Sequence, residues 1–227
     1  MSAGPETPPT NDVFFFDRRD AGRALAAALE RFRGKDVLVL GLPRGGVPVA
    51  AEVAHALDGE LDVIVARKLG SPVSAELAIG AITADGQRVL NEDVIRDLRV
   101  SEAYIEAVSS VQQADARRRE DIFRAGRPAP RITGRIVILV DDGLATGATM
   151  RAAVRAVRRQ APARLVVAVP VGAPPACETL RAEADEVVAL GEPEYFGAVG
   201  SFYRDFRQIE DDEVRHLLDE HAAAPAH

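Results

Sequence analysis

Short apolar runs alternate with helical patterns from about Val13 to His221. Strands that alternate with helices are typical of an α/β protein, because a parallel connection between two strands needs a crossover that a helix usually supplies. We therefore expect an α/β fold with a central, mostly parallel five-stranded sheet flanked by helices.

The expected core strands are 36–42, 61–67, 136–140, 164–170 and 186–190, and the expected helices are 19–33, 45–57, 101–125, 148–160, 174–183 and the segment past Glu210. Alternation over 78–90 predicts a hairpin with its turn at Asp85-Gly86. The charged run RRRED at 117–121 is expected to be solvent-exposed. Ligands of such sheets bind at the carboxyl ends of the strands, which directs attention to the loops there.

A length of 227 residues fits one domain. We divide the chain into a disordered tail over 1–12, a single domain over 13–221 and a frayed tail over 222–227. Within the domain, 101–125 is expected to be an insert helix, and 13–33 and 191–221 are expected to form a small hood.

The net charge of -7 and the pI near 5.2 argue against a nucleic-acid partner. The one cysteine, Cys177, excludes a disulfide or a cysteine-based metal site within one chain. No run approaches the roughly 20 apolar residues that span a bilayer, and the start lacks the regions of a secretory signal. We expect a cytoplasmic protein with no membrane partner.

Residues 136–150 read IVILVDDGLATGATM, in which an apolar strand precedes two aspartates and a loop of small residues. The loop leads into a helix N-terminus, where free N–H groups and the helix dipole favour phosphate. Asp141 and Asp142 repel phosphate, but they can accept hydrogen bonds from vicinal ribose hydroxyls. The alternative is a capping aspartate before an ordinary turn. The whole pattern favours a sugar phosphate.

This stretch resembles the motif with which type I phosphoribosyltransferases bind 5-phosphoribosyl 1-pyrophosphate (PRPP). The resemblance implies that Asp141 and Asp142 bind the ribose 2- and 3-hydroxyls and that the loop holds the 5-phosphate. It also implies the family's α/β fold with a small hood and a flexible loop. The implied PRPP-binding residues are Asp141, Asp142, Gly143, Leu144, Ala145, Thr146, Gly147, Ala148 and Thr149.

The loop after the first strand reads GLPRGG, and it resembles the pyrophosphate loop of the family. Gly45 and Gly46 would let backbone N–H groups approach an anion, and Arg44 would add a charged fork. The alternative is a plain turn between strand and helix. The family often has a cis peptide in this loop, and Pro43-Arg44 is the bond that would adopt it here.

Arg67 and Lys68 are expected at the end of the second strand, where the resemblance implies contact with pyrophosphate; alone they could be a solvated pair. Gly70 to Ala75 resembles the mobile loop that closes over the site in the family, with Glu76 near its end. Glu76 is the one carboxylate we can offer as a general base. The implied catalytic set is Asp141, Asp142, Arg44, Lys68 and Glu76.

The acceptor is read from segments that the family does not share. The stretch 194–208 holds five of the chain's aromatic residues, whose faces could stack on a planar acceptor or could anchor this segment on the core. The candidates are Tyr195, Phe196, Phe202 and Tyr203. Ala145 stands where enzymes that salvage 6-oxopurines carry an acid, which argues against such an activity.

The resemblance implies an enzyme that binds PRPP with Mg²⁺ and transfers the phosphoribosyl group to or from a nitrogenous acceptor, with pyrophosphate as the leaving group. The Mg²⁺ would be held indirectly through PRPP, with direct ligation by Asp141 and Asp142 as the alternative. A regulator that binds PRPP or a nucleotide without transfer is the rival interpretation, and a phosphatase or kinase ranks last. The acceptor stays unnamed, and a homodimer stays open.

Overall fold

The computed structural model describes residues 14–75 and 77–223. Its central sheet has five strands, all parallel, in the order β2-β1-β6-β7-β8. These strands are β1 (Val37–Gly41), β2 (Glu60–Val63), β6 (Ile136–Val140), β7 (Arg164–Val171) and β8 (Glu186–Gly191). The sheet confirms the predicted fold class. The predicted tail over 1–12, Glu76 and residues 224–227 lie outside the described residues.

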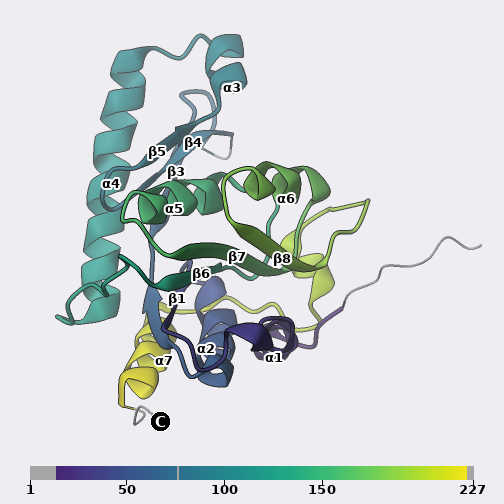
Figure 1. The fold of residues 1–227 in the computed structure, drawn as a ribbon. Coiled ribbons are helices and arrows are strands. Elements are labelled where there is room, and N and C mark those ends of the chain that lie inside the picture. Colours follow the sequence, from purple (N-terminus) through teal and green to yellow (C-terminus); the bar gives the residue numbers. More distant parts are fainter. Residues whose placement is uncertain (1–13, 76, 224–227) are drawn as a thin grey trace, which may run out of the picture.

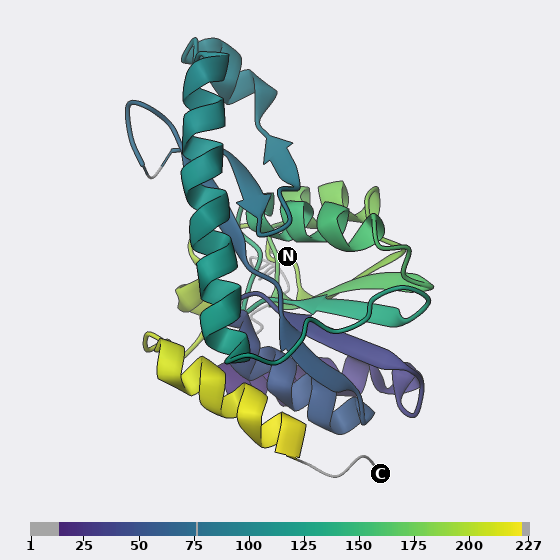
Figure 2. The ribbon, with the colours of Figure 1, turned by 90° about the vertical axis from the view of Figure 1, so that its left-hand side faces the viewer.

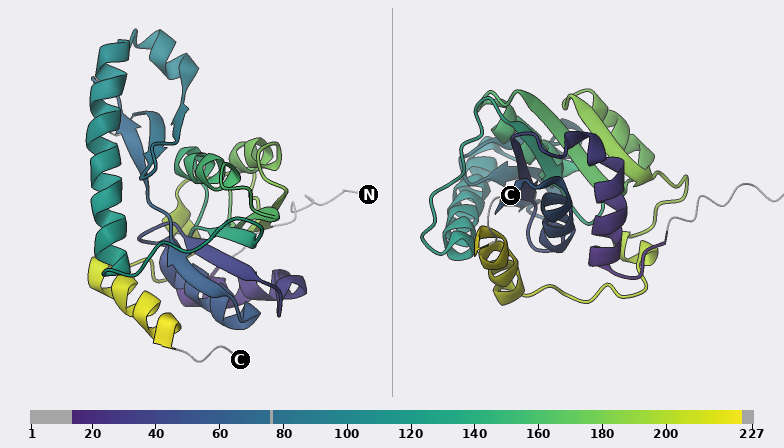
Figure 3. Two further views of the ribbon diagram at one scale, coloured as in Figure 1. Left: turned by 60° about the vertical axis from the view of Figure 1, so that its left-hand side comes forward. Right: turned by 60° about the horizontal axis from the view of Figure 1, so that its bottom comes forward.

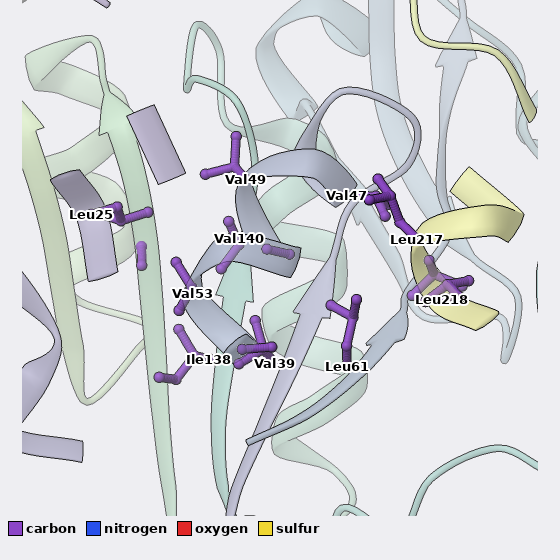
Figure 4. Packing of buried hydrophobic residues seen from close by; sticks show 14 of the residues in the cluster. Leu25, Val39, Val47, Val49, Val53, Leu61, Ile138, Val140, Leu217 and Leu218 are labelled. Carbon is purple, nitrogen blue, oxygen red and sulfur yellow. The ribbon is translucent and has the colours of Figure 1, made fainter. Parts of the chain in front are cut away.

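Helices cover both faces of this sheet (Figure 1). One face carries α1 (Arg18–Ala28), α2 (Gly46–Leu57) and α7 (Asp211–Ala223), and the other carries α5 (Ala148–Arg158) and α6 (Pro174–Arg181). Side chains of β1 alternate between the two layers, since Val37 and Val39 join the first core and Leu38 and Leu40 the second. Figure 4 shows part of the first core, in which helix side chains meet the sheet.

An arm projects from this body and consists of a small antiparallel sheet and two helices (Figures 2 and 3). Its strands are β3 (Ala66–Gly70), β4 (Ala78–Thr83) and β5 (Arg88–Leu90), and its helices are α3 (Glu92–Asp97) and α4 (Glu102–Arg124). The predicted hairpin turn is confirmed, with Gly86 at φ 89°. The predicted long helix is confirmed too, but α3 was not predicted. Among the described residues, no helix is both long and apolar enough to cross a bilayer.

Two predicted elements need correction. The strand expected over 61–67 is split, because β2 ends at Val63 and β3 begins at Ala66 in the other sheet. The pairing of this segment with β1 ends at the N–H of Ile64, which donates to the carbonyl of Gly41 (3.1 Å), and the next N–H, that of Val65, donates to the carboxylate of Glu120 on α4 (3.0 Å). The first helix ends at Ala28 and a short 3₁₀ turn, Glu30–Phe32, follows it, so the predicted span 19–33 was too long.

The charged run at 117–121 is only partly solvated, which corrects a further expectation. Glu120 is largely buried and accepts a hydrogen bond from Arg124 (2.8 Å). The Arg124 guanidinium also donates to Asp62 (3.0 Å) and to the carbonyl of Val63 (3.0 Å). Burial raises the pKa of both Asp62 and Glu120, and Arg124 opposes that rise. One arginine therefore ties α4 to the edge strand β2.

We predict that Arg124→Leu lowers the free energy of unfolding by about 3 kcal/mol, because it leaves Asp62 and Glu120 buried without their cation. The matched control is Arg118→Leu, on the same helix but two-thirds exposed, which should change it by less than about 0.5 kcal/mol. Urea denaturation measures both variants. Equal effects of the two substitutions would contradict the role given to Arg124.

Candidate functional site

Two loops leave the same edge of the sheet side by side. β1 and β6 are parallel neighbours in which Gly41 pairs with Val140, so the loops after both strands begin at one level. The N–H of Leu42 donates to the carbonyl of Val140 (2.8 Å), which continues the pairing one residue into the first loop. The GLPRGG loop and the VDDGLATGAT loop are therefore adjacent.

The two aspartates pack directly against the two glycines of the neighbouring loop. A Cβ added at Gly45 would lie 2.0 Å from Oδ2 of Asp142, and one added at Gly46 would lie 2.6 Å from the carbonyl oxygen of Val140. The N–H of Gly46 already donates to the carbonyl of Leu42 (3.0 Å). Both glycines are thus required for the close approach of the loops. The N–H of Gly46 is not free to bind an anion, contrary to the reason first given for this glycine.

The loop after Asp142 presents unpaired backbone donors. Leu144 is fixed on both sides, since its N–H donates to the carbonyl of Val171 (2.9 Å) and its carbonyl accepts from the N–H of Ala173 (2.7 Å). Gly147, at φ 75°, turns the chain into α5. Within the described part of the chain, the N–H groups of Ala145, Thr146 and Gly147 make no hydrogen bond. A fixed loop with free donors at a helix N-terminus suits a phosphate.

The two carboxylates differ in their electrostatic surroundings. Burial raises the pKa of Asp141 well above its usual range, and the adjacent Asp142 raises it further. Burial also raises the pKa of Asp142, but the Arg18 guanidinium opposes that rise from 2.7 Å. Within the part of the chain that the structure describes, Asp142 therefore has an ion-pair partner and Asp141 has none.

Arg18 is a site residue that the sequence interpretation missed. It is the first residue of α1, and its Nε donates to Oδ2 of Asp142 across 124 residues of chain. Tyr203 fixes the same aspartate from another side, because its hydroxyl donates to the backbone carbonyl of Asp142 (2.6 Å). The signal that could have found Arg18 is a cation at a helix N-terminus, where the dipole disfavours it.

The Pro43-Arg44 bond is cis, as predicted. The side chain of Arg44 is about one-third exposed and lies near the carboxylates of Glu210 (3.5 Å) and Asp211 (3.7 Å). Arg44 thus lies at the edge of the two loops, and both of its ion pairs are long. Its contact with pyrophosphate stays a prediction.

Arg67 and Lys68 lie inside β3, not at the end of a core strand, because of the split described above. They occupy opposite faces of the small sheet. Arg67 points to α4 and pairs with Asp115 (3.0 Å). Lys68 is exposed and shares its face with Ala66, which packs against the same small apolar cluster as Ala148 of α5. Among the described residues, Lys68 has no ion-pair partner.

The aromatic candidates separate into different environments. Tyr195 is 88% exposed, and Phe196 and Phe202 form a tilted ring pair with centroids 5.2 Å apart. Tyr203 is buried between Phe15 and Phe206 and donates to the loop of Asp142. Tyr203 therefore anchors this segment on the loop of Asp142. Of the two interpretations that the sequence allowed, stacking and anchoring, the contacts of Tyr203 fit anchoring.

The side chains at this site suit a metal ion that is coordinated mainly by a bound phosphate compound and by water. Across the described residues, no group of three or more His, Cys, Asp or Glu side chains is placed to hold a metal ion. Asp141 and Asp142 supply two carboxylates at most. Mg²⁺ commonly takes one or two carboxylates together with substrate phosphates and waters, so these residues fit such an ion.

Comparison with known proteins shows similarity to one protein family. The profile of the phosphoribosyl transferase domain matches residues 18–207. Two proteins of Mycobacterium tuberculosis, from strains CDC 1551 / Oshkosh and ATCC 25618 / H37Rv, are provisionally named phosphoribosyl transferases and are 51% identical over 205 residues. That alignment covers 90% of this chain and 46% of each relative, so the chain spans about half the length of the curated relatives it matches.

One solved structure is similar over nearly the whole chain. The crystal structure of TT1426 from Thermus thermophilus is 47% identical in sequence and superposes with a TM-score of 0.77. The match covers 91% of this chain and 98% of that one.

We predict that Gly46→Ala lowers the free energy of unfolding by more than about 2 kcal/mol. The new Cβ would meet backbone atoms at 2.6 Å and 2.8 Å, which cannot move as a side chain can. Helix propensity alone would give the opposite sign, because alanine is favoured over glycine in a helix such as α2. Gly197→Ala, where the Cβ meets nothing within 4 Å, is the control for urea denaturation. A stabilised Gly46→Ala would refute the packing argument.

We predict that Asp141→Asn raises the free energy of unfolding near pH 7 by about 1–2 kcal/mol. A carboxyl whose pKa is raised by folding contributes stability below its unfolded pKa, near 3.9, and that contribution is lost as the pH rises through its folded pKa. Asparagine does not titrate, so the gap between variant and wild type should grow from pH 4 to pH 8. Asp121→Asn, on the exposed side of α4, is the control for a carboxylate removed outside the site.

Proposed function

This chain belongs to the phosphoribosyl transferase family, and from that membership we propose that it binds PRPP with Mg²⁺ and transfers the phosphoribosyl group to, or from, a nitrogenous acceptor. The observation that carries the proposal is the juxtaposition of Asp141 and Asp142 with the free N–H groups of the following loop. Such a pair of neighbouring sites, one an acceptor of hydrogen bonds and one a donor, suits the diol and the phosphate of one sugar phosphate.

Each part of PRPP has a counterpart in this arrangement. The 5-phosphate would lie on the N–H groups of Ala145, Thr146 and Gly147, with the hydroxyls of Thr146 and Thr149 as further donors. The ribose hydroxyls would donate to Asp141 and Asp142. The pyrophosphate would face the GLPRGG loop, and Arg44 of that loop and Lys68 of the small sheet are the cations that we assign to it.

Mg²⁺, when bound, would neutralise charge between the pyrophosphate and the ribose, with Asp141 and Asp142 as its nearest protein ligands. The chain's own part is to hold the ribose still and to keep water out of the space between the two loops. Both tasks lower the barrier by orientation, because the acceptor and C1 of the ribose then meet in one geometry.

The proposed reaction is a displacement at C1 of the ribose. A lone pair on an acceptor nitrogen forms the new C–N bond, the C1–oxygen bond breaks, and pyrophosphate leaves with that electron pair. Positive charge that develops on the ribose ring would be stabilised by the nearby carboxylates. Glu76 remains the candidate for removing the proton of the acceptor.

The acceptor is the open part of the proposal. Ala145 is exposed at the place where an acid would be expected for a 6-oxopurine, which favours another acceptor class. The exposed ring of Tyr195 and the paired rings of Phe196 and Phe202 are the surfaces on which a planar acceptor could stack.

We predict that the Asp141→Asn, Asp142→Asn double variant binds PRPP in the presence of Mg²⁺ at least about tenfold more weakly than the wild type, because two charged acceptors of hydrogen bonds become neutral. Calorimetry measures the binding, with Asp121→Asn as the matched control for a charge removed elsewhere. Unchanged PRPP binding in the double variant would refute the assignment of the site.

Release of pyrophosphate separates the enzyme from its rival. Wild-type protein, PRPP and Mg²⁺ are incubated with a panel of nitrogenous bases and small amines, and pyrophosphate is assayed. Release that depends on one acceptor supports the transferase. Tight PRPP binding without release for any acceptor favours a regulator on the same fold, and absence of PRPP binding rejects both.

A further inference from the structure

Arg18 stands at a position that its own helix disfavours. It is the first residue of α1, where the helix dipole favours anions, and Asp17 is the cap. Its side chain is nonetheless among the few buried charged ones, with 9% of its surface exposed. A buried cation at a helix N-terminus is unfavourable, so other contacts of Arg18 must stabilise it.

Those contacts join three parts of the chain that are distant in sequence. Nε of Arg18 donates to Oδ2 of Asp142 (2.7 Å), and Nη1 donates to the carbonyl of Arg207 (2.8 Å). The guanidinium carbon lies 3.8 Å from the centre of the Phe206 ring, in a cation–π contact. The guanidinium plane is thus fixed by three different kinds of contact.

We propose that Arg18 is a positioning residue that orients the Asp142 carboxylate for the ribose hydroxyls. The inference rests on the proposed function, since it names a further residue of the same PRPP site. It extends that site to α1, which the known motif does not include.

Two hydrogen bonds, one to the side chain and one to the backbone, restrict the orientation of Asp142. Arg18 holds Oδ2, which also lies in the space that a side chain at Gly45 would need. Tyr203 holds the backbone carbonyl of the same residue. With Oδ2 held by Arg18 and the backbone held by Tyr203, the carboxylate keeps one orientation in which it can accept from a hydroxyl of a ligand.

A purely structural role explains these contacts less well. A buried ion pair stabilises a fold little more than apolar residues of similar volume would, because both charges lose their hydration. Fixed orientation of a functional carboxylate is the property that an apolar pair cannot supply. The contacts of Arg18 provide that orientation.

The test compares two ligands that differ only in the hydroxyls. Calorimetry measures the affinity for ribose 5-phosphate and for 2,3-dideoxyribose 5-phosphate in the wild type, Arg18→Met and Arg18→Lys. We expect Arg18→Met to lose about tenfold in affinity for ribose 5-phosphate and to bind the dideoxy compound as the wild type does. Arg18→Lys, which keeps the charge, should recover part of the loss. A loss that is equal for both ligands would overturn the proposal.

A double-mutant cycle supplies the second measurement. In the Asp142→Asn background, Arg18→Met should cause no further change in the ratio of the two affinities, because the carboxylate that it positions is gone. Additive effects would overturn the positioning role. Arg19→Met is the control, since Arg19 is the next residue of α1, is half exposed and forms a long ion pair with Glu52, at 3.7 Å.

These outcomes are distinct from a failure of the proposed function. If the wild type binds neither PRPP nor ribose 5-phosphate, the proposed function fails. If the wild type prefers ribose 5-phosphate over the dideoxy compound and Arg18→Met keeps that preference, only the role of Arg18 fails. Thermal unfolding of each variant shows that it is folded, and should Arg18→Met not fold, Arg18→Lys and Phe206→Leu carry the same comparison.

Discussion

The close contact between the two aspartates and the two glycines is the constraint on which the site depends. Gly45 and Gly46 leave the volume into which Asp142 and the backbone at Val140 fit, and any larger side chain would push the loops apart. Since β1 and β6 are hydrogen-bonded neighbours, the sheet brings the loops to this distance. Two motifs that are distant in sequence are therefore complementary parts of one surface, and neither can change alone.

That contact is unfavourable for the fold by itself, because it places two carboxylates side by side with little water. Arg18 forms an ion pair with Asp142, whereas Asp141 has no ion pair among the described residues and feels that arginine only from a distance. A ligand that donates hydrogen bonds to the pair would lessen the repulsion between the two carboxylates. Sites of binding commonly retain such destabilising features, which is why a substitution can gain stability there while it loses function.

Most of the secondary structure and the adjacency of the two loops could be predicted from the sequence, because both follow from patterns of neighbouring residues. The strands, the hairpin turn and α4 follow from patterns within a few residues, and the adjacent loops follow from parallel strands meeting at one edge. The split at Val63 could not be predicted, because the partner of Val65 is a side chain 55 residues further on. Arg18 was missed, and the partner of Tyr203 could not be named, for the same reason, since Asp142 is remote in sequence from both.

The segments that hold Asp142 in place come from the start of the described chain and from the stretch that precedes α7. The N–H of Phe15 donates to the carbonyl of Phe202, and the N–H of Arg204 donates to the carbonyl of Phe15, both at 2.9 Å. This short pairing brings Arg18 and Tyr203 to the same aspartate. The orientation of Asp142 is therefore a property of three docked segments rather than of the loop that carries it. A motif of a dozen residues carries the proposal of the ligand class, but the tertiary structure decides how the carboxylate is oriented.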